Sequence, residues 1–91
     1  MNMIRKTIYF AGRVQGVGFR ETARHVARGY AVTGYVRNLP DRRVELVVEG
    51  EQQEIERFVA GITEKMEGFI KSQTHGTSQA TAEFSDFHVK R

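Results

Sequence analysis

Apolar and polar side chains alternate in three segments of the first half of the chain, residues 4–12, 32–39 and 43–49. Alternation with a period of two places successive side chains on opposite faces of an extended backbone, so each segment is predicted to be a β-strand. Pro40 and Asp41 supply a turn between the second and third segments. These two segments are therefore predicted to form a β-hairpin.

Two other segments repeat apolar residues at the spacing of a helix. The first starts at Phe19 and has Gly29 placed to end it. The second starts at Gly50 and carries Lys65 near its end, before Gly68. The apolar positions of the two segments are Phe19, Ala23, Val26, Ala27, Tyr30, Ile55, Phe58, Val59, Ile62 and Met66. Each helix is amphipathic and is expected to pack on a sheet.

The C-terminal part of the chain is more polar. A strand is predicted for residues 69–75, although the apolar signal stops at Ile70 and the run 72–81 is rich in Ser, Thr and Gln. The sequence therefore leaves the length of this strand undecided. A last short strand is predicted where apolar residues return, within residues 84–89.

The order of these elements predicts an α+β domain, a two-layer α/β sandwich (βαββαβ) in which both helices cover one face of an antiparallel sheet. A crossover through the first helix makes the first two strands parallel, so both end at the edge where that helix begins. Asn38 is then expected to face the loop before the helix, with the first two strands about 10 Å apart if the third lies between them. Because Asn38 precedes Leu39 and Pro40, a plain turn-starting role is an equal alternative.

The loop before the first helix is rich in glycine. Gly16 and Gly18 can adopt positive φ angles that point successive backbone N–H groups into one concavity, at the positive end of the helix dipole. A phosphate fits such a site. Arg20, a cation in the first helical turn, opposes the dipole by about 0.3–1 kcal/mol unless an anion compensates it. A bound anion would do so, and a surface ion pair with Glu21 or Glu49 is the alternative.

Composition narrows the classes of function. A chain of 91 residues is expected to form one domain, residues 1–91, with a single core. It has no Cys, which excludes disulfides, thiol nucleophiles and cysteine zinc sites and fits a reducing cytoplasm. No signal sequence and no apolar run of about 18 residues occurs, so no membrane partner is expected. The net charge of +3 favours anions, and the spread of basic residues favours a small anion over nucleic acid.

Other chemistry has little support in the sequence. His25, His75 and His88 lack metal-ligand spacing, so no metal site is expected. Glu45 and Glu49 are interpreted as part of a solvated strand face rather than as an acid–base pair. The glycine spacing matches neither a dinucleotide motif nor a P-loop. Nothing suggests an obligate interface, so a monomer is expected.

Residues 10–20 (FAGRVQGVGFR) resemble the first signature of the acylphosphatases, and residues 34–38 (GYVRN) resemble the second, in the same order and at a matching separation. This resemblance implies a ferredoxin-like fold that hydrolyses small acyl phosphates to a carboxylate and inorganic phosphate, without metal or cofactor. It places the phosphate-binding arginine on Arg20 and the water-orienting asparagine on Asn38. It places the phosphate cradle on the backbone of Gln15, Gly16, Val17, Gly18 and Phe19.

The resemblance has departures and rivals. Phe10 replaces an aliphatic residue, and Arg42 stands where the hairpin turn of the family usually has Gly, at a cost of about 1–2 kcal/mol if its φ is positive. One rival is an RNA-binding module of the same fold, with Tyr9 and Tyr35 as stacking residues. The other is a non-catalytic module that captures a phosphate or carbamoyl phosphate for a partner.

Overall fold

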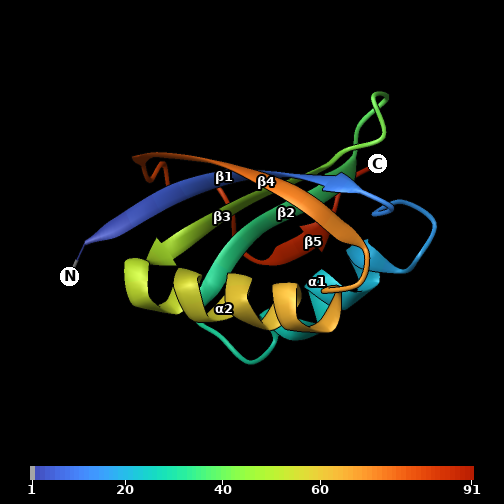
Figure 1. Cartoon of the computed structure of the whole chain (residues 1–91). Coiled ribbons are helices and arrows are strands. Elements are labelled where there is room, and N and C mark those ends of the chain that lie inside the picture. The colour runs from blue at the N-terminus through green and yellow to red at the C-terminus, as the bar shows by residue number, and fades with distance from the viewer. Residues whose placement is uncertain (1) are drawn as a thin grey trace.

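Two helices cover one face of a single five-stranded sheet in the computed structural model, which describes residues 2–91 (Figure 1). In chain order the elements are β1 (Met3–Gly12), α1 (Phe19–Ala27), β2 (Val32–Asn38), β3 (Val44–Glu51), α2 (Gln52–Lys65), β4 (Ile70–Gln79) and β5 (Phe87–Val89). The predicted two-layer α+β architecture is confirmed, and it is ferredoxin-like. Neither described helix has the length and apolar character needed to cross a membrane.

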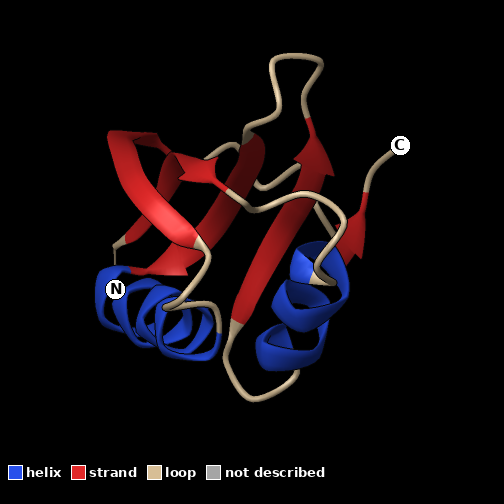
Figure 2. Cartoon of the chain, turned by 45° about the vertical axis from the view of Figure 1, so that its right-hand side comes forward, coloured by secondary structure: helices blue, strands red, loops and turns tan. Residues whose placement is uncertain are grey.

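The strands lie in the order β4-β1-β3-β2-β5. β3 pairs antiparallel with both β1 and β2, so β1 and β2 run parallel with β3 between them, as the crossover rule predicts. The turn of the β2–β3 hairpin projects beyond the sheet at the top of Figure 2. The short β5 pairs with β2 in parallel and makes the sheet mixed, whereas the four longer strands pair with one another antiparallel.

Two boundaries differ from the predictions. β4 ends at Gln79 rather than near His75. It is an edge strand whose backbone pairs with β1 while most of its side chains are exposed, so polar residues do not end it. β3 includes Gly50 and Glu51, so α2 begins at Gln52. Pairing with β1 continues to this point and keeps the backbone extended.

The core lies between the helices and the sheet. Ile8 and Phe10 of β1 and Leu46 of β3 are fully buried, as their alternation predicts. The ring of Phe19, the first residue of α1, packs 4.9 Å from the ring of Phe10. Burial of an aromatic side chain of this size contributes about 1.5–3 kcal/mol. The contact therefore holds the start of α1, and with it the end of the glycine-rich loop, against the sheet.

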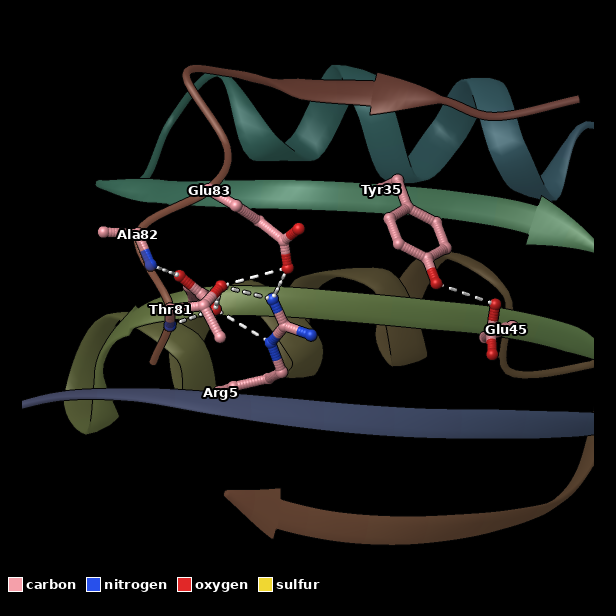
Figure 3. Close-up of polar contacts among 7 residues, drawn as sticks. Arg5, Tyr35, Glu45, Thr81, Ala82 and Glu83 are labelled. Atoms are coloured by element: carbon pink, nitrogen blue, oxygen red, sulfur yellow. Dashed lines mark hydrogen bonds and ion pairs between the residues drawn. The ribbon is translucent and has the colours of Figure 1, made fainter. Parts of the chain in front are cut away.

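Residues 80–86, here called the crossing segment, run over the opposite face of the sheet on their way from β4 to β5 (Figure 3). Arg5 of β1 donates from Nη2 to Thr81 Oγ1 at 2.7 Å and forms an ion pair with Glu83. Phe84 packs on Tyr35 of β2, with ring centroids 5.8 Å apart. The crossing segment is thus tied to β1 and to β2.

Two carboxylates are buried on this opposite face, which corrects their interpretation as a solvated strand face. Glu49 is 2% exposed and Glu45 is 7% exposed. Glu49 accepts hydrogen bonds from the backbone N–H groups of Thr81 and Ala82, each at 2.9 Å, and from Arg5 Nε at 2.8 Å. The carboxylate of Glu45 accepts hydrogen bonds from the side chains of Tyr9, Tyr35 and Arg37. The crossing segment and these side chains replace water around both groups.

Candidate functional site

The glycine-rich loop joins β1 to α1. Gly16 and Gly18 have φ angles of 79° and 81°, in the left-handed region predicted for them. The N–H of Thr22 begins the hydrogen bonding of α1 by donating to Gly18 O at 2.9 Å. In the part of the chain that the structure describes, the N–H groups of residues 16–19 donate to no protein acceptor. The loop therefore offers free donors at the positive end of α1.

Arg20 and Asn38 line the same cleft, which has a volume of about 310 Å³. Arg20 comes from the first turn of α1, and Asn38 is the last residue of β2. The cleft is also lined by Val14, Gly16, Gly18, Phe19, Glu21, Arg24, Val89 and Arg91. The crossover that makes β1 and β2 parallel thus brings the two side chains together, as the sequence predicts.

Neither acid that the sequence offers as a partner for Arg20 is paired with it. Glu21 forms an ion pair with Arg24 at 2.7 Å, and the Arg24 hydrogen bond lowers the pKa of the Glu21 carboxyl. Glu49 is bound to Arg5 on the far side of the sheet. Arg20 forms no ion pair with any residue in the range 2–91. Neither of the two ion pairs that the sequence offered for Arg20 is therefore present in the structure.

Asn38 lines the cleft and lies next to the hairpin turn. Its Oδ1 is buried and has no hydrogen-bond partner among the described residues. The turn is closed by the backbone, since Leu39 N–H donates to Arg43 O at 2.9 Å. The side chain that caps the turn is Asp41, which accepts a hydrogen bond from Arg43 N–H at 3.1 Å. Within residues 2–91 no hydrogen bond joins the Asn38 side chain to the turn, and its Oδ1 is a buried acceptor without a donor.

Two residues of the expected phosphate cradle lie partly outside this cleft. Gln15 and Val17 line a neighbouring hollow together with Arg42, whose φ of 76° is the positive value anticipated for it. Gln15 Nε2 donates to Leu39 O and to Arg43 O, each at 2.9 Å. The side chain of Gln15 thus faces the hairpin.

Sequence reasoning did not place four residues in the cleft that line it, Val14, Arg24, Val89 and Arg91. Arg24 lies four residues after Arg20 on α1, so helical periodicity was a usable signal for it. Val89 and Arg91 reach the cleft because β5 pairs with β2, and no local pattern indicates that pairing. No group of three or more potential metal ligands occurs within the described residues.

Comparison with known proteins finds acylphosphatases. A family model described as Acylphosphatase matches residues 6–89. An acylphosphatase of Methanospirillum hungatei is 36% identical over 90 residues, which cover 98% of this chain and 99% of that protein. One from a Roseiflexus species is 50% identical over 60 residues, which are 66% of this chain and 64% of that protein.

The fold is also similar to that of solved acylphosphatases. The crystal structure of an acylphosphatase from Bacillus subtilis matches with a TM-score of 0.85 at 26% identity, over 97% of this chain and 99% of that one. The matched family model includes both the glycine-rich loop and the end of β2. The chain therefore belongs to the acylphosphatase family.

Proposed function

We propose that this chain is an acylphosphatase, an enzyme that hydrolyses acyl phosphates to a carboxylate and inorganic phosphate. One observation carries the proposal: Arg20, which has no acidic partner in the range 2–91, and the buried, unpartnered Oδ1 of Asn38 share a cleft with the glycine-rich loop. Arg20 and the loop are suited to bind an anion, and Asn38 Oδ1 is suited to bind a water molecule beside it.

In this proposal the phosphate binds to the backbone N–H groups of residues 15–19 and to the Arg20 guanidinium. A hydrogen bond from N–H to a charged oxygen contributes about 1.5–3 kcal/mol. The planar guanidinium grips two phosphate oxygens at once, which an ammonium group does not reproduce. These donors stabilise the charge spread over the phosphoryl oxygens during transfer.

Asn38 orients the attacking water in the same proposal. Its Oδ1 accepts a hydrogen bond from the water. The water oxygen then attacks phosphorus on the side opposite the departing acyl oxygen. The bond from water oxygen to phosphorus forms as the phosphorus–acyl oxygen bond breaks, and the carboxylate leaves with that electron pair. Both protons of the water remain with the phosphate product, because the carboxylate leaves unprotonated. An acid with a pKa of about 4 leaves as its anion, so no general acid is needed.

The proposed partner is a small-molecule acyl phosphate, and the proposed enzyme is a single-domain monomer in the cytoplasm. Several features support this assignment. Arg20 and the loop amides address the phosphate, while the acyl group meets a cleft with few neutral polar groups. The absence of Cys fits a reducing compartment. The proposed chemistry uses no metal or cofactor.

RNA binding is the weaker alternative. Tyr9 and Tyr35 lie on the open face of the sheet, where stacking residues would be needed. Their hydroxyl groups, however, donate to the buried Glu45 at 3.2 and 3.1 Å. Phe84 of the crossing segment packs on Tyr35 as well. The aromatic rings are thus engaged within the protein and poorly placed to receive bases.

A single set of assays separates the readings. Hydrolysis of benzoyl phosphate by the purified chain is measured beside calorimetric binding of inorganic phosphate and titration with a single-stranded RNA. An acylphosphatase turns over benzoyl phosphate and binds phosphate but not RNA. Phosphate binding without turnover would support a capture module for acyl or carbamoyl phosphate, and RNA binding alone would support the RNA module.

Asn38→Ala tests the assignment of the water. Removing the acceptor is expected to lower kcat by roughly 10²-fold, the effect of losing one transition-state hydrogen bond. Phosphate affinity and Tm should change little, because Asn38 Oδ1 has no partner within residues 2–91. Asn2→Ala is the matched control, since Asn2 is exposed and outside every strand and helix. Retention of near-normal kcat in Asn38→Ala would remove Asn38 from the mechanism.

A further inference from the structure

The side chain of Gln15 links the glycine-rich loop to the β2–β3 hairpin. We propose that Gln15 is a positioning residue, whose amide holds Asn38 at the right place relative to the phosphate cradle and Arg20. This inference rests on the proposed function and adds a role distinct from that of the Gln15 backbone. Gln15 acts in it through Asn38 and does not itself touch the water.

The amide of Gln15 donates to both ends of the hairpin turn. Its Nε2 lies 2.9 Å from Leu39 O and 2.9 Å from Arg43 O, so each of its two hydrogens has an acceptor. Leu39 directly follows Asn38 in the chain. Arg43 directly precedes Val44, the cross-strand partner of Asn38. The link therefore meets the hairpin at the level of Asn38.

The hairpin turn does not need Gln15 to satisfy its backbone. Arg43 O also accepts the N–H of Leu39 at 2.9 Å, and Leu39 O also accepts the N–H of Arg42 at 3.1 Å. Removing the Gln15 amide thus leaves neither carbonyl without a donor, which limits the loss of stability. What the amide adds is a connection between two parts of the chain.

Few other contacts fix the glycine-rich loop relative to the β2–β3 hairpin. Val14 is fully buried and anchors the loop to the core, and the N–H of Arg13 donates to Phe69 O at 2.9 Å. Among residues 2–91, the two bonds of Gln15 are the hydrogen bonds that join residues 14–18 to residues 38–44. The direct hydrogen bonding between the loop and the hairpin is therefore supplied by this one side chain.

This dependence bears on the water more than on the phosphate. The cradle and Arg20 belong to one continuous stretch of chain and keep their mutual arrangement without the hairpin. Asn38 belongs to the other side of the link. A shift of about 1 Å between reacting groups can lower a rate by about 10²-fold. Loss of the link should therefore lower kcat while phosphate binding persists.

The test uses Gln15→Met, which keeps the length of the side chain and removes its donors. With benzoyl phosphate, kcat is expected to fall about tenfold or more, while the inhibition constant of inorganic phosphate changes less than about threefold. In an Asn38→Ala background, Gln15→Met should cause little further loss, because the residue it positions is gone. Gln73→Met is the matched control, since Gln73 bonds to Thr63 and His75 away from the cleft.

Gln15→Glu adds a signature that a purely structural role would not give. The carboxylate cannot donate to Leu39 O or Arg43 O near neutral pH, but its protonated form donates one hydrogen. The ratio of kcat in Gln15→Glu to kcat in Gln15→Met should therefore rise severalfold as the pH is lowered towards 5. The protonated side chain makes part of the link again.

The outcomes distinguish this inference from the proposed function. A wild-type chain without hydrolase activity would overturn both. An active wild type with normal kcat in Gln15→Met would overturn the inference alone. So would a loss that multiplies in full with that of Asn38→Ala, or a loss of phosphate affinity as large as the loss of kcat, since Gln15 would then act on the cradle itself.

Discussion

The molecule contains two sites with donors that can surround an anion. They differ in whether the anion comes from the chain itself or from a ligand. On the face of the sheet opposite the helices, Arg5 and the backbone N–H groups of Thr81 and Ala82 hold the carboxylate of Glu49. On the other side, Arg20 and the glycine-rich loop line an open cleft. Both combine one guanidinium with backbone donors beside a left-handed residue.

The backbone geometry of the two places is alike. Ala82 has a φ of 59° and Gly18 a φ of 81°. At the Glu49 site the chain supplies its own anion, so the guanidinium and the backbone N–H groups stabilise the fold. In the second no acid within residues 2–91 pairs with Arg20, so the same parts are available to a ligand. The comparison teaches that the occupant, more than the donors, decides whether such a place serves stability or function.

Arg20→Lys should have the largest effect and act on function alone. The ammonium keeps the charge but loses the two-pronged contact, so kcat/KM for benzoyl phosphate should fall by roughly 10²-fold. The urea unfolding midpoint should be unchanged, because Arg20 forms no ion pair in the range 2–91. Arg28→Lys, just after the end of α1, is the control. An unfolding midpoint that falls with the rate would make Arg20 a structural cation.

Glu49→Gln should have the next largest effect and act on stability. It removes a charge that is 2% exposed and accepts bonds from Arg5 and from the crossing segment. We expect a loss of about 2 kcal/mol in the free energy of unfolding, measured with urea. Glu83→Gln is the control, because Glu83 pairs with the same Arg5 but is 56% exposed, and its loss should be much smaller. Equal losses would show that burial of Glu49 contributes nothing.

Acid should weaken the same place. Burial raises the pKa of Glu49, but hydrogen bonds from Thr81 N–H, the Arg5 side chain and Ala82 N–H lower it more, to below its ordinary value of 4.5. The unfolded chain then takes up the proton first, so this stabilisation is present above about pH 4.5 and is lost as pH falls through the folded pKa. The urea midpoint should drop as the pH is lowered below about 4.5. The drop should be smaller in Glu49→Gln, and an identical drop would contradict this linkage.

Exchanging the left-handed residues should give the smallest effects, of opposite sign. A Cβ at Gly18 meets nothing within 4 Å, so Gly18→Ala costs backbone strain alone, about 1 kcal/mol. Ala82→Gly relieves similar strain but adds freedom to the unfolded chain, for a net gain of about 0.5 kcal/mol. Urea unfolding of both variants measures the pair. Two changes of the same sign would contradict the shared geometry.

Most of the fold could be predicted from the local periodicity of apolar residues in the sequence. The hairpin and both helices follow from alternation and helical spacing, and the handedness of the crossover then placed Asn38 opposite the glycine-rich loop. Gly16 and Gly18 have the φ angles that their residue type allows. These features depend on neighbours in sequence or on one general rule of topology.

The features that sequence reasoning missed depend on contacts between distant segments. β4 continues through polar residues because β1 pairs with it, whatever its side chains are. Glu49 reads as a surface residue on β3 until the crossing segment covers it. The link from Gln15 to the hairpin and the arrival of Arg91 in the cleft likewise need tertiary structure. No local pattern encodes these contacts.

The route of the crossing segment has a consequence for the assembly of the cleft. Residues 87–91 form one of its walls, and they are synthesised after every other strand of the sheet. A ribosome-bound chain that lacks them already contains Arg20 and Asn38 but not the side of the cleft that Val89 closes. The complete cleft therefore forms only when β5 docks against β2, and the formation of the β2–β3 hairpin is not enough.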